Sequence, residues 1–205
     1  MTHIFMTTYM LFLCIISGCY LPIFGQQLNY MKILSISFIL ILSISLSLRA
    51  QRIDSLFLEA AITKLQHSKE YTMKVANLMP EVKYLFKPTA GEMSFGEQLL
   101  HLSSNMGWLC STYLNGSSNP ITKADMELQK KEEIISVLNK SYDYAINILQ
   151  RFKPANLADT VPFFAGPLNK LQIINLLNDH QTHHRAQMIV YLRLNGIKPP
   201  DYVGW

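Results

Sequence analysis

Apolar residues recur every three to four positions along most of the chain after residue 51, which is the spacing of amphipathic α-helices. The pattern predicts four helices, at about residues 53–78, 94–114, 130–152 and 168–194. No segment shows the alternating pattern of a convincing strand. Long amphipathic helices joined by short and medium loops are typical of a four-helix bundle. We therefore predict an all-α fold.

Several predicted helix ends carry recognisable signals. Ser94 followed three residues later by Glu97 forms a capping box at the start of the second helix. Asn115-Gly116 and Asn195-Gly196 are common helix exits, and Pro80 ends the first helix.

The first 50 residues follow a different pattern. An apolar run, 33–48, comes directly after Lys32, and Ala50-Gln51 is a plausible cleavage point, so the segment reads as a signal peptide with Met31 as the expected start. An uncleaved membrane anchor is the alternative, although the run is shorter than the ~20 residues of a typical span. We expect residues 1–51 to be a targeting region that delivers the domain, residues 52–205, to the periplasm or cell envelope.

Two of the three cysteines, Cys14 and Cys19, lie in the targeting region. Ile16-Ser17-Gly18-Cys19 resembles a bacterial lipoprotein box, but no basic residues stand ahead of it. Cys110 is alone in the domain and has no partner for an internal disulfide. A buried, apolar role is expected for it rather than that of a reactive thiol or metal ligand.

Charge excludes one class of partner. All 14 acidic residues and all but two of the 18 basic residues lie after residue 50, so the domain is nearly balanced. A nucleic-acid-binding domain usually has a basic patch or stripe, and none stands out. We expect a small-molecule substrate, no nucleic acid, and membrane contact only through the N-terminal segment.

Two histidines carry the strongest chemical signal. His180 and His184 are four residues apart, about one helical turn, so they share one face of the last predicted helix. That face is otherwise apolar, with Ile173, Leu177, Met188 and Tyr191. Two imidazoles in an apolar stripe are costly to bury without partners, and a metal ion explains them best.

A metal site needs at least a third ligand, and His101 is the candidate. It lies at the border of the apolar stripe of the second helix, so periodicity alone does not prove that it meets the other two. Gln181 stands where the HExxH peptidases have their general base, which counts against that class.

The chain also resembles a known family, the DinB-like (DNA-damage-inducible B, YfiT-like) superfamily of metal-binding four-helix bundles. The resemblance covers residues from about 53 onward. It rests on Met79-Pro80-Glu81, Tyr84-Leu85-Phe86-Lys87-Pro88, Ser94-Phe95-Gly96-Glu97-Gln98-Leu99-Leu100-His101-Leu102, His180-Gln181-Thr182-His183-His184-Arg185-Ala186-Gln187 and Val190-Tyr191-Leu192-Arg193-Leu194-Asn195-Gly196-Ile197-Lys198-Pro199-Pro200.

The resemblance implies that His101, His180 and His184 form a metal triad. It implies zinc or nickel as the metal, with at least one coordination position left to water or substrate. Better-known members transfer small cellular thiols such as bacillithiol or mycothiol, so a thiol cosubstrate is implied, and members often form homodimers. An exported protein would not meet a cytosolic thiol, which opposes this part of the implication.

Five further residues are weighed around the triad. Gln187 could hold a ring N–H or a metal-bound water, or it could be a polar residue at the mouth of the bundle. Glu97 could accept a hydrogen bond from a ligand or act as a general base, although its role in the capping box already explains its presence. His183 is expected at the surface or beside the ligands, with a role as alternative ligand less favoured. Trp108 lines a pocket or belongs to the core. Arg185 is expected to hold the bundle or an interface rather than a substrate.

These observations favour a metal-dependent enzyme of transferase or hydrolase type that activates a thiol or a water. Three neutral imidazoles leave the charge of a divalent ion uncompensated, and such an ion acidifies what it binds. A non-catalytic metal- or ligand-binding module of the cell envelope is the second hypothesis. A plain bundle without metal is the third.

Overall fold

The computed structural model of the chain describes residues 21–203. It divides into two compact units, Met1–Ala50 and Gln51–Trp205. We call the second the bundle unit, and each unit is described by itself.

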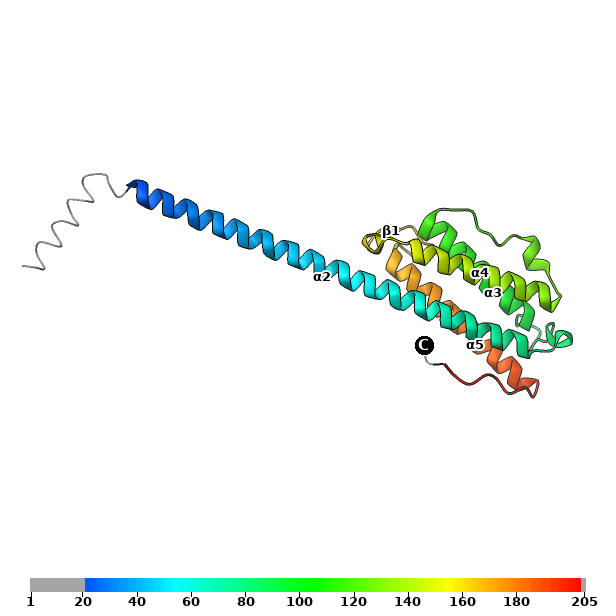
Figure 1. Cartoon of the computed structure of the whole chain (residues 1–205). Coiled ribbons are helices and arrows are strands. Elements are labelled where there is room, and N and C mark those ends of the chain that lie inside the picture. Colours follow the sequence, from blue (N-terminus) through cyan, green and yellow to red (C-terminus); the bar gives the residue numbers. More distant parts are fainter. Residues whose placement is uncertain (1–20, 204–205) are drawn as a thin grey trace, which may run out of the picture. The chain divides into compact units, whose positions relative to one another are not determined.

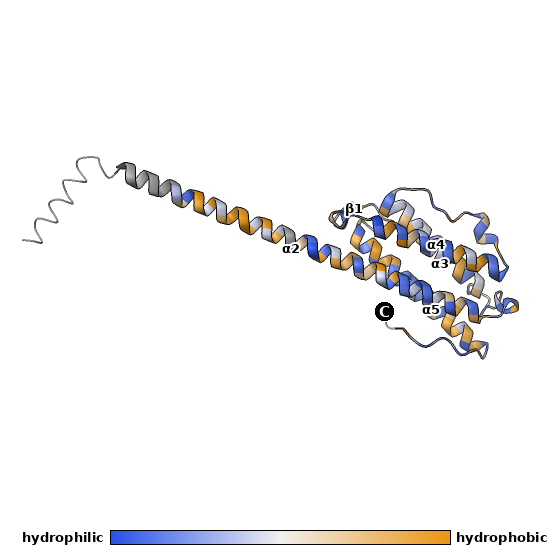
Figure 2. Ribbon diagram, in the orientation of Figure 1, coloured by the Kyte–Doolittle hydropathy of each residue, from blue (hydrophilic) through white to orange (hydrophobic). Residues whose placement is uncertain are grey.

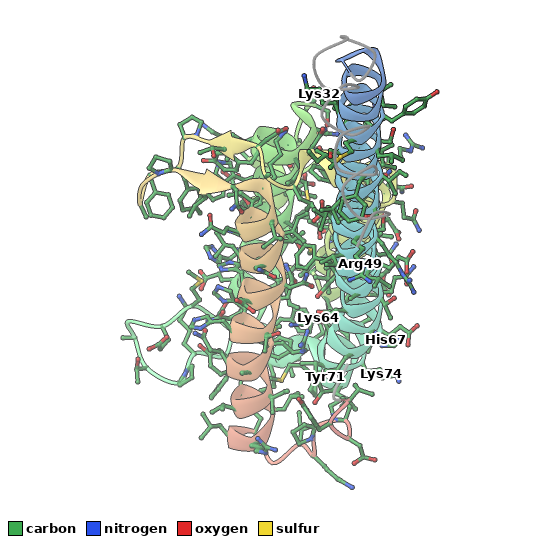
Figure 3. All side chains as sticks on the ribbon, turned by 90° about the vertical axis from the view of Figure 1, so that its left-hand side faces the viewer. Lys32, Arg49, Lys64, His67, Tyr71 and Lys74 are labelled. Atoms are coloured by element: carbon green, nitrogen blue, oxygen red, sulfur yellow. The ribbon has the colours of Figure 1, made fainter. Side chains whose placement is uncertain are left out.

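The N-terminal unit contains the first part of helix α2, which extends over Leu21–Leu78 (Figure 1). Its side chains are exposed from residue 30 to residue 47, and they are largely apolar (Figure 2). Lys32 and Arg49, labelled in Figure 3, flank the uncharged run 33–48 within this helix. An 18-residue window of mean hydropathy 2.1, none of it buried, makes α2 long and apolar enough to cross a membrane.

Helix α2 corrects one sequence-based expectation. The helix predicted to begin near residue 53 continues instead from the apolar segment without a break. No glycine or proline occurs between residues 26 and 79, so nothing in the sequence interrupts the helix. The lipoprotein-like motif and Cys14 and Cys19 lie outside the described residues.

The bundle unit confirms the all-α prediction. Its four long helices are the second part of α2, then α3 (Phe95–Leu109), α4 (Lys131–Arg151) and α5 (Lys170–Leu194). Helix α3 continues into a π-helical turn, Cys110–Asn115, and ends at Gly116, whose left-handed φ of 65° favours glycine. Short 3-10 turns occur at Glu81–Lys83, Ala124–Glu127 and Pro154–Asn156.

Two sets of side-chain interactions, one with backbone carbonyls and one with another side chain, show the direction of α4 relative to α2. The Lys131 ammonium donates hydrogen bonds of 2.8 Å to the Asn77 and Met79 carbonyls at the end of α2. Farther along, Lys69 pairs with Asp143 at 2.5 Å, so α4 runs antiparallel to α2. The long connection after α3 returns the chain to the end of the bundle where α2 finishes and α3 begins. Helices α3 and α4 therefore run parallel (Figure 1).

A two-stranded hairpin departs from the prediction that no strands are present. Strands β1 (Thr160–Val161) and β2 (Leu168–Asn169) pair antiparallel between α4 and α5. The hairpin takes the first two residues of the predicted last helix, which begins at Lys170. Asn169 caps it by accepting from the Gln172 amide at 2.9 Å, and Gln172 accepts from the Asn169 amide in return.

The core contains a buried polar network as well as apolar side chains. The hydroxyl of the buried Tyr142 contacts Ser68 at 3.2 Å and Thr72 at 2.9 Å, and Arg185 donates to both Ser68 and Thr72. The Arg185 guanidinium also lies over the ring of Tyr71, which projects from α2 (Figure 3). Arg185 therefore joins α5 to α2, as expected.

Candidate metal centre

Two helices bring the three predicted histidines together. His101 lies on α3, and His180 and His184 lie one turn apart on α5. One ring nitrogen from each of the three lies within 4.8 Å of the others. The ring centroids are 5.2 Å apart for His101 and His180, 4.7 Å for His101 and His184, and 4.4 Å for His180 and His184. The convergence that periodicity left open is therefore present.

The orientation of His184 is set by a buried chain of hydrogen bonds. Its Nδ1 lies 2.5 Å from Oε1 of Gln98, whose amide Nε2 donates to the Tyr191 hydroxyl at 3.3 Å. That hydroxyl donates to the Met93 carbonyl at 2.9 Å. Because the Gln98 carbonyl oxygen only accepts, Nδ1 of His184 must carry the proton. The lone pair on its Nε2 is then left for a ligand bond.

Unlike His184, His180 has a buried ring nitrogen without a hydrogen-bond partner in the described part of the chain. Its Nε2 is buried and forms no hydrogen bond within residues 21–203. An unsatisfied buried nitrogen costs about 1–3 kcal/mol, so the arrangement needs a compensating interaction. A metal ion bound by this nitrogen would supply one, and the residues present therefore fit a metal.

Burial keeps the three imidazoles neutral. Desolvation, followed by the neighbouring histidine charges, lowers the pKa of His180 to about 4 and that of His184 to about 3. Desolvation and the charge of His183 also lower the pKa of His101. Neutral imidazole is the form that binds metals, so the site is prepared for them at neutral pH.

One side of the centre opens to a pocket that His101 lines. The pocket lies between the start of α3 and the loops on either side of it, and it is lined by both charged and apolar side chains: Lys87, Glu92, Met93, Glu97, Leu100 and Met126. Of the three histidines, only His101 is among the lining residues of this pocket.

His183 and Gln187 lie beside the triad and not in it. His183 is exposed, and its ring meets that of His184 edge-on at 5.0 Å. The Gln187 side chain lies 2.9 Å from Nε2 of His183. The hydrogen bond to a triad ring that we considered for Gln187 is made by Gln98 instead.

Glu97 has the capping role that its sequence position indicates. Its carboxylate accepts from the Ser94 amide at 2.6 Å and pairs with Lys87 at 2.9 Å. The Ser94 amide and the Lys87 ammonium hold the pKa of Glu97 below its usual value. The carboxylate is thus engaged as an ionised cap on the wall of the pocket.

Trp108 and Cys110 lie farther along the same helical segment. Trp108 contacts Tyr113, Phe163 and Phe164, whereas the pocket beside His101 is lined by other residues. Cys110 is fully buried, and burial raises the pKa of its thiol to about 12. The expected apolar role of Cys110 is therefore confirmed.

Gln98 and Tyr191 are the neighbours of the site that sequence reasoning missed. Both are buried. Gln98 lies three residues before His101, on the helix face that is otherwise apolar, and a glutamine at such a position was the available signal. Tyr191 was assigned only to the apolar stripe, although a buried tyrosine hydroxyl usually has a partner.

Comparison with known proteins agrees with this architecture. A curated relative, the uncharacterized protein YjoA of Bacillus subtilis (strain 168), is 23% identical over 132 residues, which cover 62% of this chain and 84% of the relative. The crystal structure of YjoA superposes with a TM-score of 0.59 at 17% identity, covering 70% of this chain and 96% of that one. A DinB-like protein from Bacillus cereus ATCC 10987 superposes with a TM-score of 0.58 at 19% identity, covering 71% and 97%.

The family model of the DinB superfamily matches residues 64–188. This match spans more than half of the chain and includes all three histidines, all of α3 and most of α5. The chain therefore belongs to the DinB superfamily.

Proposed function

We propose that the protein is a divalent-metal-dependent enzyme of hydrolase or transferase type that acts on a small molecule. His101, His180 and His184 would hold zinc or nickel. The observation that carries the proposal is the convergence of three neutral imidazoles, of which His180 presents a buried nitrogen without a partner.

Each residue has a separate part in this proposal. When bound, a divalent ion on three neutral ligands supplies Lewis-acid chemistry that makes a water or a thiol nucleophilic near neutral pH. Gln98 holds His184 in the tautomer that presents Nε2. The pocket beside His101 admits substrate, and Lys87 and Glu97 on its wall form an ion pair next to that opening.

Among the residues that the structure describes, no protein nucleophile is evident near the site. The Cys110 thiol is buried and protonated at neutral pH. The Glu97 carboxylate is engaged by Ser94 and Lys87. Activation of an external water or thiol is therefore favoured over covalent catalysis by the protein.

We further propose that the apolar segment of α2 directs the protein across a membrane, which places the domain in the periplasm or cell envelope. The length and hydropathy of that segment support the proposal. Outside the cytoplasm a cytosolic thiol cosubstrate is absent, so hydrolysis is the first reaction to test.

A matched set of variants tests the enzyme hypothesis. Zinc- and nickel-loaded protein is assayed against ester, amide and phosphoester substrates, and against thiol acceptors with added low-molecular-weight thiols. Activity should be lost in His101→Ala and retained in His67→Ala, because His67 is an exposed histidine outside the triad. Stoichiometric metal without activity in any class, and without a metal-coordinated water that exchanges with solvent, would favour the non-catalytic module.

A further inference from the structure

Four aromatic side chains cluster at one end of the bundle unit, and we call them the aromatic tip: Trp108, Tyr113, Phe163 and Phe164. The rings of Phe163 and Phe164 are 4.4 Å apart, and Trp108 stacks on Phe164 at 6.5 Å. Tyr113 contacts both Trp108 and Phe163. Although it belongs to this cluster, Phe164 remains 84% exposed.

The turn of the β1–β2 hairpin holds Phe164 at the surface. The residue lies in the turn between β1 and β2, with Pro162 before it and Pro167 after it. The Gly166 amide closes the turn by donating to the Phe163 carbonyl at 3.1 Å, and its φ of 110° suits glycine. The hydrogen-bonded turn thus holds the Phe164 ring exposed at the surface of the bundle unit.

The aromatic tip lies at the end of the bundle unit where the chain enters it. Lys131 at the start of α4 bonds to the end of α2, and Asp143 pairs with Lys69 farther back along α2. The last turns of α4 and the hairpin that follows therefore lie toward Gln51. In this first part of the bundle unit, Ile53 and Leu56 are also largely exposed, by 66% and 55%.

The sequence preceding Gln51 indicates what could cover these apolar side chains. The apolar segment of α2 is joined to Gln51 through only Arg49 and Ala50, with no glycine or proline that would form a flexible linker. A bilayer that holds this segment would begin within a few residues of the bundle unit. Trp and Tyr are enriched at the level of the lipid headgroups. Phe, Trp and Leu form the apolar face of segments that lie in this interface.

We propose that the aromatic tip contacts the lipid surface of the membrane that holds the N-terminal segment, with Phe164 inserted among the headgroups. This inference rests on the membrane part of the proposed function and not on the metal site. It assigns the exposed hairpin a partner, a phospholipid surface, and it implies that the segment is retained as an anchor.

The test uses the full chain reconstituted in vesicles of phosphatidylcholine and phosphatidylglycerol. Cys14 and Cys19 are replaced by serine, and the buried Cys110 is kept. An NBD fluorophore is attached to Ala165→Cys at the tip or, as the matched control, to Val82→Cys, which is 86% exposed near the opposite end of the bundle unit. Lipids brominated just below the headgroups serve as quenchers.

The inference predicts blue-shifted emission that brominated lipids quench at residue 165 and not at residue 82. Phe164→Ser should reduce the quenching at residue 165 without changing the circular dichroism spectrum. Equal emission at both sites in vesicles that retain the protein would overturn the inference. So would a blue shift in detergent that grows with protein concentration, because a second copy would then cover the tip. Failure of the chain to stay with the vesicles would overturn it together with the membrane proposal, while the metal content would still report on the metal site.

Discussion

Nδ1 of His184 and Oε1 of Gln98 lie 2.5 Å apart, both on side chains that are almost fully buried. Through Gln98 the ring is connected to Tyr191 and to the Met93 carbonyl. Outer partners of this kind fix the tautomer and the ring orientation of a metal-binding histidine. The hydrogen bond to Gln98 thus fixes the tautomer and orientation of His184 that metal binding requires.

Gln98→Leu should therefore weaken zinc binding, by roughly 10- to 100-fold if it behaves as other outer partners do. The leucine removes the acceptor for Nδ1–H and leaves the imidazole free to rotate or change tautomer. Competition with a chromophoric chelator at neutral pH measures the change. Gln187→Leu is the control, since the Gln187 amide lies within hydrogen-bond distance of the exposed His183. Equal losses in both variants would show that Gln98 has no special role.

The metal-free protein should lose stability as the pH falls. The pKa values of His180 and His184 in the folded chain are about 4 and about 3, below the value near 6.5 expected when unfolded. The unfolded chain therefore binds more protons, and the free energy of unfolding drops as the pH falls from about 6.5 through the folded values. Urea unfolding at pH 7.5, 6 and 5 tests this. Replacing both histidines by leucine should flatten the dependence, and an unchanged slope would contradict the assigned shifts.

Cys110 should react only when the protein unfolds. Its thiol is buried, and a pKa of about 12 leaves almost no thiolate at neutral pH. In a Cys14→Ser, Cys19→Ser background, a disulfide reagent such as DTNB should modify Cys110 slowly in buffer and rapidly in denaturant. Fast modification of the folded protein would restore the reactive-thiol hypothesis.

The sequence predicted most of the fold for physical reasons that can be named. The period of the apolar residues located the helices, and the Ser94–Glu97 capping box located the start of α3. The hairpin was missed because two-residue strands contain too few positions to show alternation. The start of α2 was misplaced because the composition changes near residue 50, where the two units divide, although the helical backbone does not end there.

The candidate site was predicted less completely. The spacing of His180 and His184 is local and visible in the sequence, but their meeting with His101 depends on the packing of α3 against α5. Gln98 was overlooked because a glutamine within an apolar stripe has no local partner to reveal its role. Its bonds to His184 and Tyr191 span 86 and 93 residues.

The polar network around Tyr142 should contribute to stability. Its hydroxyl contacts Ser68 and Thr72, which Arg185 also contacts. Tyr142→Phe removes one buried partner from these groups, and we expect a loss of about 1–2 kcal/mol in the free energy of unfolding. Tyr144→Phe is the control, because its hydroxyl bonds Ser117 at the exposed surface. Chemical denaturation measures both, and a larger effect at Tyr144 would contradict the role of the network.

Metal content tests the central claim most directly. The full chain, purified in detergent without an affinity tag, is incubated with zinc or nickel, desalted and measured by elemental analysis beside a His180→Ala, His184→Ala double variant and the His67→Ala control. The three-histidine centre predicts about one ion per chain in the wild type and in His67→Ala, and none in the double variant. Absence of metal from the wild type, or its full retention by the double variant, would contradict the claim.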